Sequence, residues 1–305
     1  MPSEVQIRRD AGEQVRQTAI RQLEKALKAL TRQAKTPRSQ DTSVHTARKR
    51  LKEVRALLRL VRDDLGKLVF TQNNRALRDI ARPLSELRDA AALLQALESL
   101  RTRGKGKLKK RPYEVVRKVL RARRSDLRRR IIDSEDTLNK AASSLQLVHN
   151  SVSRWNFSHG TWSVLIPGLR DTYSKGQRAM RIANNTPADE HLHEWRKRTK
   201  DLRNQLELLE SLWPAQMKSP AAMARKVTDL LGDDHDLAVL LAVIESAGTE
   251  VPADVTFALR SAVNQRRAEL QSSAKSLGSK LFRQSPGGFG GSGRRAPRKT
   301  AAVSR

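Results

Sequence analysis

Two stretches of this chain place their apolar residues at the spacing of one helix face. At about 100° per residue, one stripe of the stretch 44–61 is apolar, and so is one stripe of the stretch 192–209. The first stripe consists of Val44, Ala47, Leu51, Val54, Leu58 and Val61, and the second of Leu192, Trp195, Leu202, Leu206 and Leu209. Each stretch is therefore predicted to be an amphipathic helix that buries this stripe in a core.

Beside each apolar stripe lies a row of cations headed by a histidine. Both stretches read H-x-x-R-K-R-x-K-x-x-R, and equivalent residues are 148 positions apart, as for His45 and His193 (193 − 45 = 148). The first row comprises His45, Arg48, Lys49, Lys52, Arg55 and Arg59, and the second comprises His193, Arg196, Lys197, Lys200 and Arg203. One such row is typical of a solvated helix face, but two rows in register predict a duplicated binding site.

The remaining apolar periodicity predicts more helices and almost no strand. In the first half we expect a helix over 4–31, then a linker at 31–43, and then a helix that has Thr42 and Ser43 as candidate N-caps and ends near Leu65. Two more helices are expected, one over 71–100 with a kink or restart at Pro83 and one over 113–143. In the second half we expect helices over 162–182, around the second row up to Trp213–Pro214, over 221–247 and over 254–282. The chain is thus predicted to be all-α, with repeats at about 4–148 and 160–282 and a disordered, basic, glycine-rich tail at 283–305.

The composition narrows the class of partner. The 305 residues contain 61 Lys and Arg against 32 Asp and Glu, and this formal net charge of +29 favours a polyanionic partner. Cysteine is absent, which excludes disulfides, thiolate zinc sites and cysteine nucleophiles. The N-terminal residues lack the apolar core of a secretory signal, and no stretch approaches the ~20 apolar residues of a membrane span. We therefore expect a cytoplasmic protein without a membrane span.

Two further motifs give the chain a family resemblance. They are the LRD and LGDDHDL segments at 87–89 and 231–237, and the run GLRDTYSKGQRA at 168–179. Together with the paired helices, over residues 4–282, they resemble the CHAD domain, an all-α family named for its histidines. The resemblance implies one domain at 1–282, built from two tandem four-helix bundles related by a pseudo-two-fold axis around a basic central cavity. It also implies non-catalytic binding of inorganic polyphosphate and attachment to polyphosphate granules.

Other arginines are candidates for the same site, because they align on a helix face, repeat between the halves or lie in the run at 168–179. One line on the helix predicted at 113–143 comprises Arg117, Arg121, Arg124 and Arg128. The predicted polyphosphate-binding set therefore extends the two histidine-headed rows by Arg78, Arg117, Arg124, Arg170, Arg178, Arg260 and Arg267. The planar guanidinium group of each arginine can donate hydrogen bonds to two phosphate oxygens, and a helix places successive arginines at intervals along a polymer.

The second half departs from this pattern at three positions. Glu207 stands where the first half has Arg59, and Asn264 and Gln271 stand where the line on 113–143 has its second and fourth arginines. These substitutions remove positive charge from the second half. We therefore expect the two halves to contribute unequally to binding.

The two repeated histidines have a chemical role in this hypothesis. A histidine among cations tends to stay neutral in the empty site, and a bound polyanion then favours its protonation. We expect His45 and His193 to donate hydrogen bonds to phosphate oxygens, with affinity that rises as the pH falls through the histidine range. The alternatives are a capping or packing histidine, or a metal site with His191 and His235. Because the neighbouring Arg and Lys would repel a metal cation, we expect neither a metal nor a cofactor.

Two other classes of function stay open from the sequence. An enzyme acting on phosphate polymers would need clustered carboxylates or a P-loop, but the chain has no E-x-E pair and no GxxxxGK[ST]. Asp89 and Asp236, which are equivalent in the repeat, are better explained as braces that keep arginines extended. An architectural nucleic-acid-binding protein is the other class, although aromatic residues make up only 4% of the chain and lie on apolar stripes. The basic loop at 101–111 and the tail are expected to add non-specific nucleic-acid binding.

Overall fold

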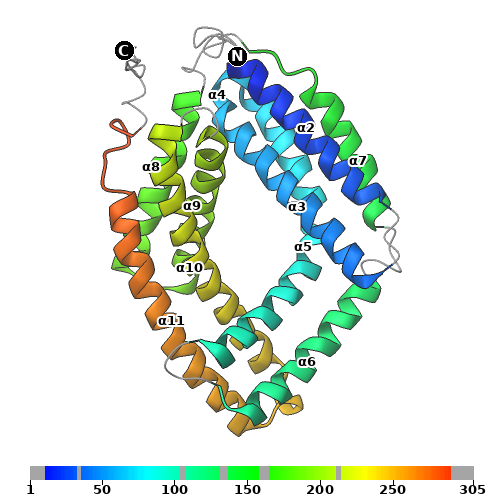
Figure 1. Ribbon diagram of the computed structural model, residues 1–305, viewed down its shortest axis with the longest axis vertical. Helices are drawn as coiled ribbons and strands as arrows, with labels where there is room; N and C mark the ends of the chain where they lie inside the picture. Colours follow the sequence, from blue (N-terminus) through cyan, green and yellow to red (C-terminus); the bar gives the residue numbers. More distant parts are fainter. Residues whose placement is uncertain are drawn as a thin grey trace, which may run out of the picture.

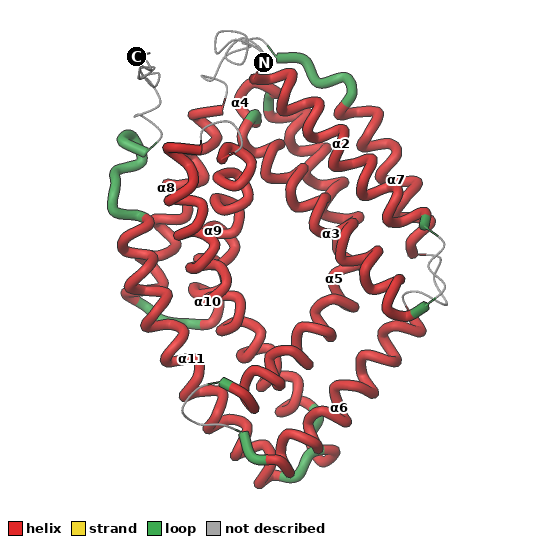
Figure 2. The backbone as a smooth tube through the Cα atoms, in the orientation of Figure 1, coloured by secondary structure: helices red, strands yellow, loops and turns green. Residues whose placement is uncertain are grey.

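Helix is the only regular structure in the described part of the chain (Figure 2). The computed structural model describes residues 11–32, 36–103, 108–130, 137–157, 165–210 and 214–289, and these ranges contain no strand. The prediction of an all-α protein is therefore confirmed.

The two predicted cation rows lie on equivalent helices of the two halves. The first half contains α2 (Ala11–Thr31), α3 (Pro37–Leu60), α4 (Arg62–Leu65), α5 (Lys67–Thr102), α6 (Lys110–Arg128) and α7 (Thr137–Val152). The second half contains α8 (Leu165–Asn185), α9 (Asp189–Glu210), α10 (Pro214–Ser246), the 3-10 turn η3 (Gly248–Glu250) and α11 (Ala253–Leu281). Helix α3 carries the first row and α9 the second.

Helix α3 begins six residues earlier than the sequence indicates. Its N-cap is Thr36 rather than Thr42 or Ser43. The Thr36 hydroxyl accepts a hydrogen bond from the Ser39 backbone N–H at 3.2 Å, and the Ser39 hydroxyl accepts one from the Thr36 N–H at 3.1 Å. This capping box, together with Pro37 in the first turn, is a stronger start signal than the later hydroxyl pair. The linker predicted at 31–43 is wrong in its second part.

The helix predicted over 113–143 is also wrong, because two helices occupy that range. Helix α6 ends at Arg128 and α7 begins at Thr137, while residues 131–136 lie outside the described ranges. Helix α7 packs on α2 and buries its own apolar face, which includes Leu145 and Val148. Both segments have helical periodicity, so the sequence pattern did not reveal the change of direction. In contrast, Pro83 neither ends nor restarts α5, which runs through it.

Two apolar cores hold the molecule together, and each takes residues from both halves. Figure 1 shows the halves side by side, meeting at two ends. The larger core joins α2, α3, α7, α8, α9 and the C-terminal end of α11 to the N-terminal parts of α5 and α10. The smaller core joins α6 and α11 to the C-terminal parts of α5 and α10. The cores therefore do not divide at the boundary between the repeats, and the implied pair of tandem four-helix bundles stays a prediction.

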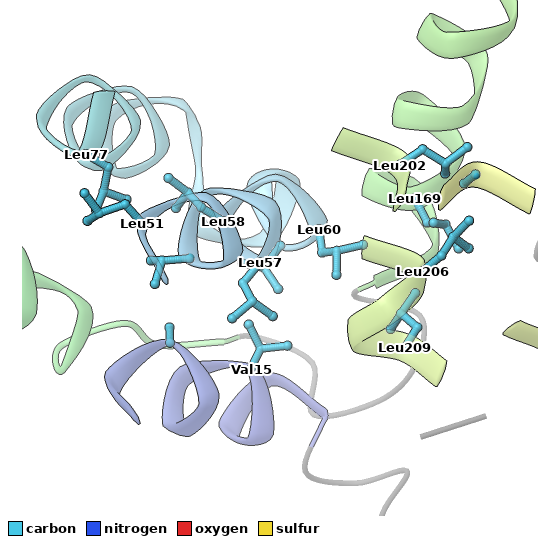
Figure 3. Packing of buried hydrophobic residues seen from close by; sticks show 14 of the residues in the cluster. Val15, Leu51, Leu57, Leu58, Leu60, Leu77, Leu169, Leu202, Leu206 and Leu209 are labelled. Carbon is cyan, nitrogen blue, oxygen red and sulfur yellow. The ribbon is translucent and has the colours of Figure 1, made fainter. Parts of the chain in front are cut away.

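Helix α3 is the central element of the larger core. Figure 3 shows its leucines Leu51, Leu57, Leu58 and Leu60 between Val15 of α2, Leu77 of α5 and the leucines of α8 and α9. Leu51 and Leu58 expose no surface at all. Because the apolar stripe of α3 is completely buried, its cation row is held in one orientation relative to the core.

Gly168 allows the two halves to meet at this core. A Cβ at position 168 would lie 2.5 Å from the carbonyl oxygen of Arg59 and would also collide with that of Leu60. Backbone atoms cannot move aside as a flexible side chain can, so only glycine lets α8 cross α3 this closely. The first residue of the GLRDTYSKGQRA run is thus explained by packing.

The beginning of the predicted disordered tail is ordered. Phe282 and Phe289 are buried, and Phe289 stacks on Tyr173 of α8 with ring centroids 3.9 Å apart. Arg170 donates hydrogen bonds to the carbonyl oxygens of Gly287, at 3.0 Å, and Phe289. The prediction of a disordered tail is therefore wrong for 283–289. One stacked aromatic ring and hydrogen bonds to backbone carbonyl oxygens hold this glycine-rich segment against α8. Residues 290–305 lie outside the described ranges.

Candidate anion-binding site

The two repeated histidines and most cations of the rows on α3 and α9 line one cavity, which we call the histidine cavity. It has a volume of about 670 Å³ and lies among α3, α5, α9 and α10, the helices in the middle of Figure 1. Its charged and imidazole side chains are His45, Arg48, Lys49, Lys52, Glu53, Asp89, His193, Arg196, Lys200, Arg203, Glu207, His235 and Asp236. Asp89 and Asp236 lie where α5 and α10 pass from one apolar core to the other, between Leu84 and Leu93 and between Leu231 and Leu237.

A second cavity adjoins the first, and we call it the arginine cavity. It has a volume of about 510 Å³ and shares Lys52, His193, Arg196, Lys200 and Asn204 with the histidine cavity. Its other cations are Arg55, Arg59, Arg62, Lys175, Lys197 and Arg198. Since the shared residues line both spaces, the two cavities form adjoining parts of one basic surface between α3 and α9.

The two cavities differ in charge balance. Nine Lys and Arg side chains line the arginine cavity against two carboxylates, those of Asp171 and Asp201. Six line the histidine cavity against four carboxylates. Burial, together with repulsion from Arg59, lowers the pKa of Arg55 to about 10, which still leaves this guanidinium charged at neutral pH. The arginine cavity therefore has the larger surplus of positive charge.

Two lysines mark the place where the cavities join. Burial lowers the pKa of Lys52 to about 7, and repulsion from Lys200, Arg48 and Arg196 contributes to the same shift. Burial likewise lowers the pKa of Lys200 to about 8, with repulsion from Arg196 contributing. Both shifts have the physical cause expected of ammonium groups that are crowded by cations and separated from water. An anion bound here would restore both charges.

Carboxylates brace part of this cluster. Arg48 is buried, and one of its terminal nitrogens lies 3.6 Å from Asp89 Oδ1. The Asp236 carboxylate counteracts the lowering of the Lys200 pKa. Glu207 accepts a hydrogen bond from Arg203 at 2.9 Å. These contacts agree with the expectation that Asp89 and Asp236 support neighbouring cations.

The histidine of the second row has a partner that the repeat did not reveal. His193 Nδ1 lies 3.3 Å from Nδ1 of His235 on α10, and the ring centroids are 4.5 Å apart. Burial lowers the pKa of His193, and repulsion from Arg196 and Lys197 adds to the shift. Burial and Arg196 lower the pKa of His235 to about 4. From the sequence alone, His235 is a candidate only for a metal ligand, because the equivalent position in the first half is Arg88 rather than a histidine.

Metal-ligand geometry is not found among the residues that the structure describes. Within those ranges, no three His, Cys, Asp or Glu side chains are grouped so that they could hold a metal ion. His191 contacts the carbonyl oxygen of Thr186 at 2.6 Å instead of His193. The His193–His235 pair also lies beside Arg196, which opposes a second cation.

Several predicted site residues lie away from the two cavities. Arg78 is exposed beside Asp79, Arg170 holds the segment 287–289, and Arg178 is exposed on α8. Arg260 pairs with Glu245 at 2.7 Å, and Arg267 pairs with Asp189 and Asp234. Arg117 and Arg124 line a third cavity, considered below. The structure therefore brings together eleven of the eighteen predicted residues, all of them from the two histidine-headed rows.

The structure also adds cations that the sequence did not select. Arg62 lies one turn beyond Arg59, where the row continues across the short break between α3 and α4. The i, i+3 spacing of the row was a signal that could have found it. Lys175 lies in the GLRDTYSKGQRA run, and its ammonium group is 2.7 Å from Asp171. Arg198 is the counterpart of Arg50 in the aligned motif (198 − 50 = 148), so the repeat was a signal for it, although it lies off the helix face of the predicted row.

These features define an all-α protein whose duplicated helices present buried and half-buried cations to adjoining cavities. Residues 21–245 match the CHAD domain, and because this match covers most of the chain, the protein belongs to the CHAD family. No curated protein matches the sequence. In the described ranges, every helix is too short or too polar to cross a membrane.

Proposed function

We propose that this protein binds inorganic polyphosphate without catalysing a reaction, and that α3 and α9 hold the polymer in the histidine and arginine cavities. One observation carries the proposal: Lys52 and Lys200 are half-buried among Arg48 and Arg196, with pKa values lowered to about 7 and 8. Such a cluster is destabilised by its own repulsion when empty. A polymer with one negative charge per phosphate would neutralise several of these groups at once.

The shape of the site favours a thin polyanion over a duplex. The cations lie inside cavities between helices, and several are half-buried, whereas a DNA duplex presents its phosphates on the outside of a wide cylinder. The histidine cavity has no Phe, Tyr or Trp among its lining residues, and the arginine cavity has Phe70 alone. Single-stranded nucleic acid would meet one aromatic ring at most along these cavities, not the series of rings on which successive bases stack.

The arrangement of carboxylates supports binding rather than catalysis. In the histidine cavity, Asp89 lies beside Arg48 and Glu207 beside Arg203, while Glu53 accepts a hydrogen bond from Arg50. Carboxylates engaged in this way stabilise cations instead of holding the paired metal ions of phosphoryl transfer. The resemblance to polyphosphate-binding CHAD domains supports the same conclusion and a place on cytoplasmic polyphosphate granules.

Accessory binding of nucleic acid stays a prediction. The glycine-containing part of the basic loop, 104–107, and residues 290–305 lie outside the described ranges. Binding through these segments would depend on charge alone, so it would weaken steeply with salt and would not discriminate among polyanions.

A competition between polyanions tests the proposal. Long-chain polyphosphate and duplex DNA, matched in phosphate concentration, compete for the protein near physiological salt, where non-specific DNA binding is ~10⁻⁴ to 10⁻⁶ M. We expect polyphosphate to win by at least a factor of about 100. A variant with Arg48, Lys52, Arg196 and Lys200 changed to Ala should lose this preference.

The matched control removes the same charge from surfaces that line none of the described cavities. It changes Lys118, Arg123, Lys218 and Lys226 to Ala, all of which are exposed. Because Arg48→Ala can affect folding, the milder pair Lys52→Met and Lys200→Met is measured as well, with circular dichroism for each variant. Equal competition by DNA, or an equal loss in the cavity and control variants, would contradict the proposal.

A further inference from the structure

A third cavity, which we call the α6 cavity, lies between α5 and α6 and meets the N-terminal turn of α3. It has a volume of about 460 Å³. Its charged side chains are Asp41, Glu98, Arg117, Arg121, Arg124 and Arg128. The four arginines belong to one helix and recur at intervals of four, three and four residues, so they follow one line along α6.

We infer that the α6 cavity is an additional polyphosphate subsite, present in the first half only, which binds the part of a long chain that extends beyond α3 and α9. This inference rests on the proposed function and names an extension of the same site. The subsite takes linear phosphate polymers, because a line of guanidinium groups matches a row of phosphate oxygens.

The three cavities follow one another along α3. Asp41 lines the α6 cavity, His45 and Arg48 line the histidine cavity, and Arg55 and Arg59 line the arginine cavity. From Asp41 to Arg59 the helix rises about 27 Å at ~1.5 Å per residue. A polymer that follows α3 would therefore pass from the central cavities to the arginines of α6.

The arginines of α6 carry more charge than their carboxylates neutralise. Asp41 accepts hydrogen bonds from both Arg124 and Arg128, the latter at 3.0 Å. Glu98 already accepts bonds from Tyr113, at 2.6 Å, and Arg101. Arg121 is exposed, and no ion pair involves it within the described ranges. Arg117 pairs with Glu114, which does not line the cavity, at 3.3 Å. Four guanidinium groups thus face three carboxylates, and one of these, Glu98, also pairs with Arg101 outside the cavity.

The equivalent place in the second half is already neutralised. Arg267, the counterpart of Arg124, pairs with Asp189 and also with Asp234, whose side chain is buried. Gln271 donates to the same Asp234 at 2.9 Å. The position equivalent to Asp234, 147 residues earlier, is Leu87, so the first half has a leucine where the second half has this carboxylate. Asn264 and Gln271 also replace two arginines of the line, which leaves the second half without a comparable row.

A pair of matched double variants tests the inference. Arg121→Gln with Arg124→Gln removes two charges from the α6 cavity, and Lys118→Gln with Arg123→Gln removes two exposed charges from the same helix outside it. Affinities for long-chain polyphosphate and for tripolyphosphate are measured by calorimetry over a range of salt. We expect the cavity variant to bind the long chain about tenfold more weakly, with a salt slope shallower by about 1.4, and to bind tripolyphosphate normally.

The outcomes separate this inference from the proposed function. The control variant should lose less than about twofold in long-chain affinity, since distant exposed charges are screened. Equal losses in the two double variants, or an equal loss for the short and long chains, would overturn the α6 subsite. If the wild-type protein does not prefer polyphosphate to DNA at all, the proposed function itself fails. A clear preference without any effect of the α6 variant would leave that function standing and remove only the extension.

Discussion

The two halves are built from equivalent helices but neutralise the cations on these helices in different ways. In the first half, Asp41 is the carboxylate that holds Arg124 and Arg128 at the edge of a cavity. In the second half, Arg267 is fixed by two carboxylates, and Glu207 pairs with both Arg203 and Arg225. At these positions the cations of the second half thus have more carboxylate partners than their counterparts in the first half. A duplicated sequence motif therefore does not guarantee two equal binding surfaces.

The largest predicted effect concerns the crossing where the two halves meet. Gly168→Ala places a methyl group against the carbonyl oxygens of Arg59 and Leu60, and it should lower the free energy of unfolding by about 3 kcal/mol. Urea denaturation followed by circular dichroism measures this change. The same variant should weaken polyphosphate binding, because separating α8 from α3 alters the arginine cavity.

Gly232→Ala is the matched control for that substitution. A Cβ at position 232 would lie 3.7 Å from Arg196 Nε, which is ordinary contact distance. The position is inside α10, so alanine should raise the free energy of unfolding by about 0.5–1 kcal/mol. If both glycine variants are stabilised, the close crossing of α8 on α3 is wrong.

A smaller effect compares the carboxylates that hold equivalent arginines. Asp234→Ala removes a buried partner of Arg267 and Gln271 and should cost about 2–3 kcal/mol of folding free energy. Asp41→Ala should cost less than about 1 kcal/mol, because the Asp41 side chain is 30% exposed.

The same two variants should differ in binding. Removing Asp41 takes a negative charge from the edge of the α6 cavity, so long-chain polyphosphate should bind more tightly to Asp41→Ala. Asp234 does not line this cavity, and its loss should give no gain in affinity. Equal stability losses in thermal unfolding, together with equal affinities, would remove the distinction between the halves.

The smallest predicted effect concerns the histidines. The pKa of His193 in the empty site is lowered by burial and by the nearby Arg196 and Lys197. A bound polyanion raises this pKa, so affinity should rise as the pH falls from the bound-state pKa toward the free-state pKa. Between pH 7.5 and 5.5 we expect the wild type to gain about threefold more affinity than the double variant His45→Asn, His193→Asn.

His149→Asn provides the control for this pH dependence. His149 lies on α7 and lines none of the described cavities. Its variant should follow the wild-type affinity at every pH. An identical pH dependence in the His45/His193 variant and the wild type would assign the repeated histidines a packing role instead.

Sequence periodicity was sufficient for the helices that carry the central site. The apolar stripes of α3 and α9 are buried as predicted, and both rows reach the cavities because each row is fixed beside its stripe. The direction of the chain after Arg128 was not predictable in this way, because α6 and α7 have the same helical period. Helix periodicity specifies which face is buried but not which helix covers it.

Partners that come from a different helix were the hardest to predict. His235 faces His193 from α10, and Asp41 reaches Arg124 across 83 positions. Neither pairing follows from spacing along one helix. The aligned repeats already show that Asp234 stands where the first half has Leu87. That Asp234 pairs with Arg267 could be learned only from the structure.

The most direct measurement is proton uptake when polyphosphate binds at pH 8. With a pKa of about 7, Lys52 is mostly neutral in the empty site at this pH, and Lys200, with a pKa of about 8, is about half neutral. A polyanion held against them raises both pKa values, so a pH-stat should record uptake of about one proton per protein molecule. The Lys52→Met, Lys200→Met variant should take up almost none. Binding of wild type without proton uptake, or equal uptake by the variant, would show that the polymer does not occupy the cavities between α3 and α9.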